Sequence, residues 1–343
     1  MSSPGEFELI AQYFARAGHP LPTRVVLGIG DDCALLQPTP GMQWAISSDM
    51  LVSGRHFFPD VSSRTLGHKA LAVNLSDLAA CGAKPVGFTL ALSLPDADAD
   101  WLREFSQGLF TLADAHDCPL VGGDTTRGPL NICITVFGEV PPGQALLRSG
   151  ARAGDDIWVS GTLGDAAQAL HCLWGRDELP EPEKTRARQR LEQPSPRVAL
   201  GQALRGVAHA AADVSDGLLG DLGHILKASG TGAELQADVA ITLIANCAYS
   251  NWASGTFDLK TGHQARDLRY VLCGGDDYEL VFTALPARRE AVAAAAAQSQ
   301  TPVTRIGRVV AGTGVRVLGP DGQPLQGDWA SFDHFKAATG SGL

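Results

Sequence analysis

The sequence predicts a soluble protein of the α/β (α+β) class with two domains. The chain has 343 residues, which is long enough for two domains of ordinary size. Strand patterns and helix patterns alternate along it, as they do where helices pack on a sheet. A stretch rich in proline and glycine, residues 141–150, separates two such series. We therefore expect one domain over residues 1–147 and a second α/β domain over residues 148–343.

Apolar side chains at helical spacing predict helices in the first domain over residues 5–18, 69–85 and 101–116. Gly82 follows the apolar stripe of the second helix and is expected to stop it. Short apolar runs predict strands over residues 25–29, 44–47, 87–94, 119–121 and 131–138.

The second domain repeats the alternation. Strands are expected over residues 155–159, 208–212, 280–283 and 303–309. Helices are expected over residues 197–207, 218–229 and 286–299, with a solvated helix and loops over 176–196. A turn at Pro320–Gly322 predicts a hairpin, and residues 244–269 show no clear pattern. Residues 160–167 contain glycines at a strand-to-helix turn, a place where backbone N–H groups can face an anion, although glycine is common at any such turn.

The composition narrows the possible functions. Hydrophobic residues make up 45% of the chain and charged residues 19%, as is typical of globular proteins. A net charge of -10 without a basic run argues against a nucleic-acid partner. The seven cysteines form no CxxC pair, and neither a signal peptide nor a membrane-spanning run is present. We expect a cytoplasmic protein with reduced thiols and no membrane contact.

Acidic residues stand where the pattern predicts apolar surroundings or the ends of strands. The helix over residues 69–85 is almost wholly apolar yet carries Asn74 and Asp77. A buried carboxylate must be hydrogen-bonded, paired with a cation or bound to a metal ion. A satisfied core acid or a helix cap would explain one such residue, and turn formation would explain Gly28–Asp32. The remaining acids of this kind are Asp31, Asp32, Asp49, Asp124, Asp213, Asp216, Asp276 and Asp277.

We expect the strand ends to gather these acids at one edge of a sheet. Carboxylates that converge repel one another, so cations must hold them ionised together. Oxygen ligands without clustered histidine or cysteine favour Mg²⁺ over zinc or copper. Mg²⁺ held by a few carboxylates usually completes its shell with water and substrate phosphates, which indicates phosphoryl transfer.

Arg127 and Arg148 stand beside glycine-rich segments and are candidates for a bidentate phosphate clamp, or equally for surface salt bridges. His56 lies in a Gly-Arg-His loop and is either a substrate contact or a structural histidine. No P-loop and no protein-kinase motif set is present, so the sequence predicts a different kind of ATP-using enzyme.

Together these segments resemble the thiamine-monophosphate kinase family. The matching segments run in order along nearly the whole chain: GIGDDCALL (28–36), SDMLVSGRHF (48–57), KALAVNLSDLAACGAKP (69–85), GGDTTRGPL (122–130), RSGARAGD (148–155), VSGTLGDAA (159–167), DVSDGL (213–218), GGDDYEL (274–280) and DWASFDHF (328–335). The resemblance implies ATP-dependent conversion of thiamine monophosphate to thiamine diphosphate. It also implies the two-domain fold of aminoimidazole ribonucleotide synthetase, with an N-terminal ATP- and Mg²⁺-binding domain whose sheet pairs with that of a second copy in a homodimer.

The resemblance assigns roles by position in this sequence. It implies several Mg²⁺ ions, with K⁺ as a possible activator and ATP as co-substrate. The implied metal ligands are Asp32, Ser47, Ser48, Asp49, Asp77, Asp124, Asp213 and Asp216. Of these, Asp77, Asp124 and Asp213 are the implied catalytic acids. The implied ATP contacts are Gly123, Asp124, Arg148 and Ser215. The implied contacts to thiamine monophosphate are His56, Asp276 and Phe332. Many family members carry glutamate where this chain has Asp276.

Two other interpretations remain open. A related synthetase, for aminoimidazole ribonucleotide or selenophosphate, would share the general pattern, but the RHF loop, DVSDGL, GGDDYEL and the DHF tail favour thiamine monophosphate, and the reactive Cys/Lys pair expected of selenophosphate synthetase is not found. A nonenzymatic metal-binding or scaffold protein should instead carry its acids in runs on surface helices. For a kinase, we expect direct in-line transfer without a phosphoenzyme, because a phosphate monoester is largely deprotonated at neutral pH.

Overall fold

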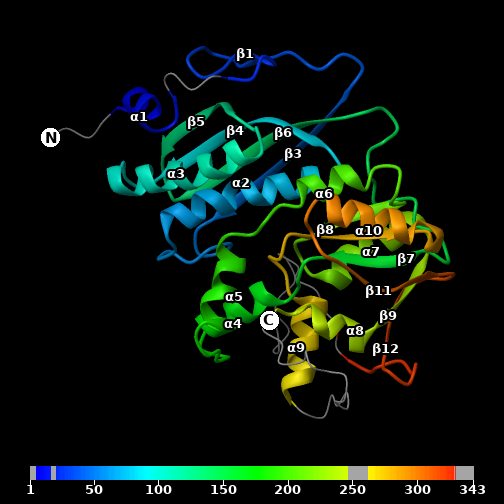
Figure 1. The fold of residues 1–343 in the computed structure, drawn as a ribbon. Coiled ribbons are helices and arrows are strands. Elements are labelled where there is room, and N and C mark those ends of the chain that lie inside the picture. Colours follow the sequence, from blue (N-terminus) through cyan, green and yellow to red (C-terminus); the bar gives the residue numbers. More distant parts are fainter. Residues whose placement is uncertain (1–4, 17–20, 246–261, 328, 330–343) are drawn as a thin grey trace. The chain divides into compact units, whose positions relative to one another are not determined.

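The computed structural model describes residues 5–16, 21–245, 262–327 and 329. The chain divides into two compact units (Figure 1). The N-terminal unit comprises residues 1–78 and 83–145, and the C-terminal unit comprises residues 79–82 and 146–343. Residues 79–82, of which the first two end the first long helix, thus belong to the second unit. Among the described residues, no helix combines the length and the apolarity needed to cross a membrane.

The N-terminal unit contains a four-stranded mixed sheet in the order β3-β6-β4-β5. The β4–β5 pair is parallel, and the other two pairs are antiparallel. A short two-stranded sheet pairs β1 with β2. The strands are β1 (Val25–Leu27), β2 (Leu35–Leu36), β3 (Gln43–Val52), β4 (Lys84–Leu94), β5 (Leu120–Arg127) and β6 (Asn131–Val140). The helices are α1 (Glu6–Tyr13), α2 (Ser63–Ala80) and α3 (Ala99–Ala115).

Helices α2 and α3 cover one face of the four-stranded sheet (Figure 1). Leu71, Leu75 and Leu78 of α2 are fully or almost fully buried, and so is Phe88 of β4. The helices cross closely, because a Cβ added at Gly108 would lie 1.9 Å from a backbone oxygen of α2. The prediction of a buried helix is therefore confirmed, although α2 begins before Lys69 and ends at Ala80, and Lys84 already belongs to β4.

The C-terminal unit contains a six-stranded sheet in the order β12-β9-β11-β7-β10-β8. All neighbouring pairs are antiparallel except β9–β12. The strands are β7 (Asp156–Ser160), β8 (Ala210–Val214), β9 (Gly232–Gln236), β10 (Glu279–Ala284), β11 (Val303–Val310) and β12 (Gly314–Leu318).

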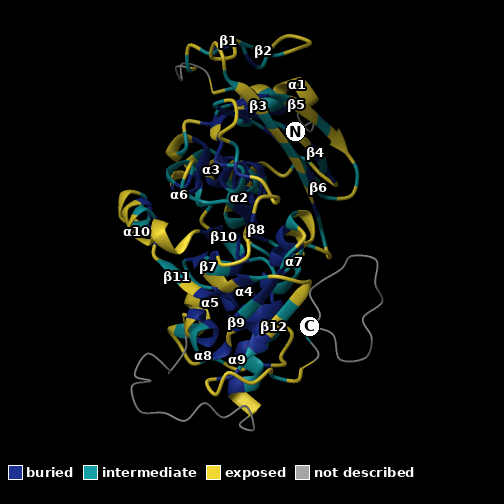
Figure 2. Ribbon diagram, turned by 90° about the vertical axis from the view of Figure 1, so that its right-hand side faces the viewer, coloured by how far each residue is buried: buried dark blue, intermediate teal, exposed yellow. Residues whose placement is uncertain are grey.

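Helices pack on this sheet, and Figure 2 shows the buried residues of each unit by colour. Leu222 and Ile225 of α7 and Leu268 of α9 join Ile157 and Val159 of β7 in one apolar core. The described helices are α4 (Asp165–Leu173), α5 (Glu183–Glu192), α6 (Val198–Ala203), α7 (Leu218–Ser229), α8 (Ala237–Ala240), α9 (Gly262–Cys273), α10 (Arg289–Gln298) and the short 3₁₀ helices η1 (Ile241–Leu243) and η3 (Pro286–Arg288).

The predicted alternation and class are confirmed, but the expectation that acids follow strand ends is wrong in three places. The strands that contain Asp49, Asp124 and Asp213 continue past these residues to Val52, Arg127 and Val214. Strand β9 and helix α8 were not expected. Gly322 has a positive φ of 74° and Leu318 bridges Pro324, in agreement with the expected hairpin turn. Phe332 and nearly all of the expected tail lie outside the described residues.

Candidate active site

Strand β3 and helix α2 bring Ser47 and Asp77 together. The Ser47 hydroxyl donates a hydrogen bond of 2.5 Å to a carboxylate oxygen of Asp77. The backbone N–H of Asp49 donates to Oδ1 of Asn74, one helical turn before Asp77, at 3.1 Å. Side chains two residues apart on a strand share a face, so Asp49 lies on the same side of β3 as Ser47. Asp77 is partly exposed while its helix neighbours are buried. These contacts explain how an almost wholly apolar helix carries an acid.

Ser48 and Asp124 lie on the other face of the sheet. The Ser48 hydroxyl contacts Oγ1 of Thr135 at 3.0 Å on the neighbouring strand β6. Asp124 is in register with Ala91 of β4, whose side chain is exposed. Strands β3 and β5 form opposite edges of the sheet, so about 14 Å, three strand spacings, separate their axes. The sheet therefore does not gather Asp49 and Asp124 at one edge, and that expectation is wrong.

Two further predicted residues lie in loops of the N-terminal unit. Asp32 follows β1 and is exposed. Its backbone N–H donates a hydrogen bond of 2.8 Å to the carboxylate of Asp31. Nδ1 of His56 accepts the backbone N–H of Val52 at 3.0 Å. A neutral imidazole with Nδ1 as acceptor carries its proton on Nε2, so His56 can donate from that nitrogen.

In the C-terminal unit the loop after β8 is fixed by a buried acid of α7. A carboxylate oxygen of Asp221 accepts the backbone N–H groups of Ser215 at 3.0 Å and Asp216 at 3.1 Å. Burial raises the pKa of Asp221 to about 7, while the two amide hydrogen bonds oppose this shift and the charge of Asp216 adds to it. The positive charge of Arg148 acts on the same carboxyl group. The structure thus groups Arg148, Ser215 and Asp216 around Asp221, which the sequence did not single out.

The turn before β10 is hydrogen-bonded to this loop. The backbone N–H of Asp276 donates to the carbonyl oxygen of Ser215, and that of Tyr278 donates to Val214, both at 2.9 Å. Leu280 of β10 is in register with Asp213 of β8. The predicted residues Asp213, Ser215, Asp216 and Asp276 therefore lie on one side of the C-terminal unit.

The two candidate arginines differ. Arg148 is exposed and its backbone oxygen accepts the hydroxyl of Ser229 at 3.3 Å. Arg127 is also exposed, and its guanidinium contacts the carbonyl of Pro95 and the carboxylate of Asp96. Arg127 thus makes a surface salt bridge, the alternative that the sequence left open.

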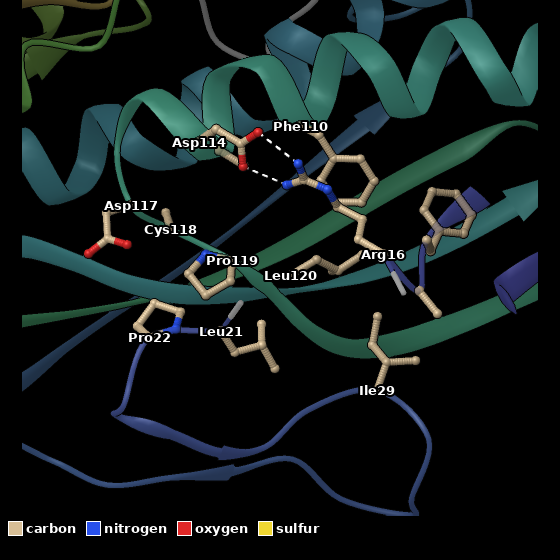
Figure 3. A pocket seen from close by; sticks show the side chains of 13 residues that line it. Arg16, Leu21, Pro22, Ile29, Phe110, Asp114, Asp117, Cys118, Pro119 and Leu120 are labelled. Atoms are coloured by element: carbon tan, nitrogen blue, oxygen red, sulfur yellow. Dashed lines mark hydrogen bonds and ion pairs between the residues drawn. The ribbon is translucent and has the colours of Figure 1, made fainter. Parts of the chain in front are cut away.

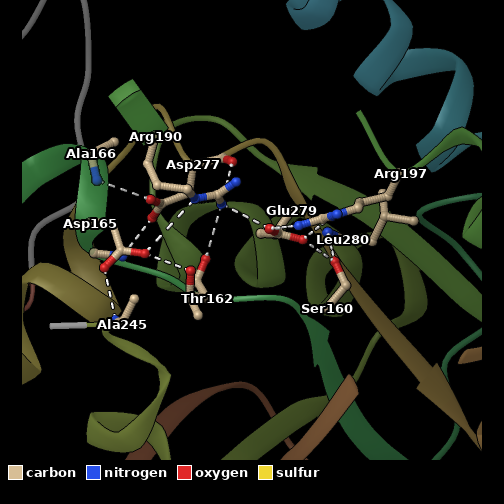
Figure 4. A network of polar contacts seen from close by, with 11 residues as sticks. Ser160, Thr162, Asp165, Ala166, Arg190, Arg197, Ala245, Asp277, Glu279 and Leu280 are labelled. Atoms are coloured by element: carbon tan, nitrogen blue, oxygen red, sulfur yellow. Dashed lines mark hydrogen bonds and ion pairs between the residues drawn. The ribbon is translucent and has the colours of Figure 1, made fainter. Parts of the chain in front are cut away.

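A buried network that sequence reasoning missed supports the turn at Asp276 (Figure 4). Glu279 is fully buried and accepts from Arg197 at 2.6 Å, from Arg190 at 2.8 Å and from the hydroxyl of Ser160 at 2.6 Å. Both guanidinium side chains are about one-fifth exposed, at 19% and 20%. The only sequence signal was a glutamate beside apolar strand residues, because its arginine partners lie more than eighty residues earlier in the chain.

The anion expected at the turn of residues 160–167 is a carboxylate of the protein itself. The carboxylate of Asp277 accepts the backbone N–H groups of Gly164 at 2.7 Å and Ala166 at 3.3 Å, at the start of α4 (Figure 4). Burial raises the pKa of Asp277 well above its usual range, and the nearby carboxylate of Asp165 adds to the shift. Asp277 is thus satisfied by helix amides and requires no cation.

A cavity of about 430 Å³ in the N-terminal unit lies elsewhere (Figure 3). Phe14, Leu21, Phe110 and Leu120 line it, and its rim carries the ion pair between Arg16 and Asp114. It contains none of the predicted site residues, so it is not the candidate active site.

Comparison with known proteins decides the family. The model of the AIR synthase related protein N-terminal domain matches residues 30–140, and that of the C-terminal domain matches residues 152–319. Thiamine-monophosphate kinase of Salmonella typhimurium is 47% identical over 96% of this chain and 98% of its own length. The chain belongs to the thiamine-monophosphate kinase family. The kinase of Escherichia coli K12 is 46% identical over 96% of this chain and 98% of its own.

Solved structures of thiamine-monophosphate kinases agree. The crystal structure of the Stenotrophomonas maltophilia enzyme is 48% identical in sequence and has a TM-score of 0.77. The match covers 88% of this chain and 93% of the chain of that structure. The structure of AaThiL complexed with AMPPCP and TMP is 29% identical, covers 87% of this chain and 89% of its own, and has a TM-score of 0.71. E. coli HypE, a hydrogenase maturation protein, is 22% identical with a TM-score of 0.71 over 94% of this chain and 95% of its own, and is alike in fold alone.

The oxygen donors of this thiamine-monophosphate kinase family member suit Mg²⁺. Ser47, Asp49 and Asp77 offer a hydroxyl and carboxylates from one face of β3 and from α2. Within the described residues no group of three or more His, Cys, Asp or Glu side chains is arranged around one point. Mg²⁺ is commonly held by one or two carboxylates together with water and substrate phosphates, so this donor set fits a metal that arrives with a nucleotide.

Proposed function

We propose that this chain transfers the γ-phosphoryl group of ATP to thiamine monophosphate and releases ADP and thiamine diphosphate. Membership of the thiamine-monophosphate kinase family carries this proposal. A phosphate oxygen of thiamine monophosphate forms the new bond to the γ-phosphorus while the bond to the β,γ-bridging oxygen breaks. The second pKa of a phosphate monoester is about 6, so the acceptor is largely deprotonated at neutral pH and no strong general base is needed.

The residues of the chain then act mainly by positioning and by charge. Bound Mg²⁺ would neutralise the phosphates of ATP. Asp32, Ser47, Ser48, Asp49, Asp77, Asp124, Asp213 and Asp216 are the proposed ligands. Ser47 holds the carboxylate of Asp77 in one orientation through its hydroxyl. Gly123, Asp124, Arg148 and Ser215 are proposed to contact ATP, and His56, Asp276 and Phe332 to contact thiamine monophosphate. The proposed ATP- and Mg²⁺-binding and dimerisation domain comprises residues 1–147, and the second α/β domain comprises residues 148–343.

The purified chain tests this proposal when it is incubated with ATP, MgCl₂ and either thiamine monophosphate or thiamine. We expect thiamine diphosphate from thiamine monophosphate and none from thiamine. Metal binding without ATP consumption would instead favour the nonenzymatic interpretation. Scrambling of isotope within ATP in the absence of acceptor would contradict direct transfer. Chelation of Mg²⁺ should abolish turnover, and replacing Na⁺ by K⁺ tests the proposed activation.

The variant Asp77→Asn tests whether the acid on α2 is part of the chemistry. Loss of one charge near transferring phosphate should lower kcat by about a hundredfold or more, as removal of preorganised charge stabilisation does. The Asn side chain keeps the shape, so the thermal unfolding midpoint should change little. Asp98→Asn, which alters an acid that caps α3, is the matched control. Activity equal to wild type in Asp77→Asn would mean that Asp77 is structural.

The proposed homodimer is supported by the exposed face of β3. Trp44, Ile46 and Met50 lie on this face at alternate positions and are 38%, 62% and 52% exposed. Phe137 of β6 packs edge-on against Trp44. An apolar sheet face of this kind usually marks a contact with another protein surface, and we propose that it pairs with the same face of a second copy. In analytical ultracentrifugation we expect the wild type to sediment as a dimer. We expect Ile46→Asp, which places a charge on this face, to sediment as a monomer.

The proposed compartment is the cytoplasm. All six cysteines within the described residues are thiols and none forms a disulfide. Thiols are typical of a reducing compartment. Cys247 lies outside the described residues.

A further inference from the structure

Asp276 lies in a turn whose backbone conformation is unfavourable. Asp276 has a φ of 67° and Tyr278 a φ of 52°, and neither residue is glycine. Side chains with a Cβ rarely adopt this left-handed region, and bulky ones such as tyrosine less often than aspartate. Such conformations persist only where the surroundings impose them, and they concentrate at functional sites. Two such residues within three positions therefore indicate that the conformation of this turn has a functional role.

The backbone of the turn is fixed on both sides. Its N–H groups at positions 276 and 278 donate to the loop after β8. The carboxylate of Asp277, between them, binds the first turn of α4. Gly275 permits the close approach, since a Cβ there would lie 2.4 Å from the carbonyl oxygen of Ser215. The backbone position of Asp276 is thus fixed, and only the rotation of its side chain remains to be determined.

Tyr278 acts on that remaining rotation. Its hydroxyl donates a hydrogen bond of 3.1 Å to Oδ1 of Asp276. Tyr278 is only 8% exposed, so its ring is packed and its hydroxyl has a defined place. Asp276 is only partly buried. A rigid donor thus holds a carboxylate that reaches solvent.

We propose that Tyr278 is a positioning residue for the phosphate acceptor. Its hydroxyl orients the carboxylate of Asp276 toward the thiamine moiety, which carries a permanently cationic thiazolium ring and an aminopyrimidine with N–H donors. A carboxylate attracts the first and accepts hydrogen bonds from the second. The inference rests on the proposed function and on the proposed contact of Asp276 with thiamine monophosphate. It adds a residue that determines affinity for the acceptor without touching it.

The variant Tyr278→Phe removes one oxygen atom and tests this role. We expect KM for thiamine monophosphate to rise about tenfold, the usual effect of losing one hydrogen bond to a charged group. KM for ATP and kcat should change less than about twofold, since the backbone contacts of the turn remain. A merely structural role predicts a different result. If the turn shifted, Ser215, to which it is hydrogen-bonded, would shift too, and KM for ATP would rise in parallel.

Tyr270→Phe is a matched control within the C-terminal unit. The hydroxyl of Tyr270 also donates to a carboxylate, that of Asp177, at 3.3 Å, and Tyr270 is 2% exposed. The two variants make the same chemical change, and we expect Tyr270→Phe to leave both KM values unchanged. Equal KM values for thiamine monophosphate in Tyr278→Phe, Tyr270→Phe and wild type would overturn the inference.

A double-mutant cycle with Asp276→Asn identifies the path of the effect. If Tyr278 acts through Asp276, Asp276→Asn and Asp276→Asn/Tyr278→Phe should have the same KM for thiamine monophosphate. Additive increases would mean that Tyr278 acts independently, which overturns its positioning role. Calorimetric titration with thiamine monophosphate should reproduce the affinities. A wild-type chain that binds and phosphorylates no thiamine monophosphate would refute the proposed function itself, whereas an active wild type with an unaltered Tyr278→Phe refutes only this inference.

Discussion

Asp276 and Glu279 lie three residues apart, and the protein holds their carboxylates in opposite ways. Glu279 opens β10, is fully buried, and contacts two guanidinium groups and a hydroxyl. Asp276 lies in a left-handed turn, reaches the surface, and receives the hydroxyl of Tyr278. A carboxylate surrounded by buried charged donors is satisfied within the protein, while a partly exposed carboxylate can also contact a ligand. Neighbouring acids of one segment can thus differ in role, and burial with partners tells them apart.

The largest effect should come from Glu279→Gln, which removes the negative charge between Arg190 and Arg197. Breaking a buried pair by changing one partner costs about 3–5 kcal/mol, since a buried charge is left uncompensated. Urea unfolding measures this loss. Glu234→Gln is the matched control, because Glu234 also accepts from two arginines, Arg308 and Arg316, which are 67% and 59% exposed. Exposed pairs contribute about 0–1 kcal/mol, so equal losses in the two variants would contradict the distinction.

Asp276→Asn should have the opposite profile. Asparagine tolerates positive φ nearly as well as aspartate, so the free energy of unfolding should change by less than about 0.5 kcal/mol. Loss of the charge should raise KM for thiamine monophosphate about tenfold to a hundredfold, as expected for a charged contact of roughly 1.5–3 kcal/mol. Steady-state kinetics and urea unfolding of the same sample measure both quantities. A variant as unstable as Glu279→Gln but with unchanged KM would show that Asp276 is structural too.

The sequence predicted the order of helices and strands well, because apolar periodicity is a local property. It placed the ends of three strands, β3, β5 and β8, too early. Ser48–Asp49 and Gly123–Asp124 are polar or glycine-rich and resemble loops, yet β3 and β5 continue through them. Their side chains alternate between the helix-covered face and the exposed face of the sheet. The periodicity of a single strand does not indicate which other strands will pair with it. The mixed order β3-β6-β4-β5 could not be predicted for the same reason.

The candidate site was predictable as a set of residues but not as a geometry. The pairing of Ser47 with Asp77 depends on how α2 packs on β3, and the role of Asp221 depends on where α7 begins after the loop. The sequence grouped Asp277 with acids that need cations, whereas two helix amides satisfy it. Partners that are backbone N–H groups leave no mark in the sequence, so a structural acid and a metal ligand look alike there.

A smaller effect, with a defined pH dependence, is expected at Asp156, another acid held by arginines in the C-terminal unit. Burial raises its pKa, but hydrogen bonds from Arg289 and Arg305 outweigh this and leave the pKa of Asp156 below its usual range. A carboxyl group with a lowered folded-state pKa stabilises the protein above its unfolded-state pKa of about 4, and this contribution is lost as the pH falls through the folded-state value. The two arginines are about half exposed, at 51% and 43%, so solvent screening limits the contribution to about 1 kcal/mol.

Asp156→Asn should therefore be less stable than wild type by about 1 kcal/mol at pH 7, and the difference should vanish as the pH falls through the lowered folded-state pKa of Asp156. Urea unfolding at a series of pH values measures it. The loss at pH 7 should lie between those of Glu234→Gln and Glu279→Gln, because Asp156 is buried like Glu279 but its arginines are exposed like those of Glu234. A difference that grows as the pH falls would mean that Asp156 is protonated in the folded protein, and that the arginines do not control its charge.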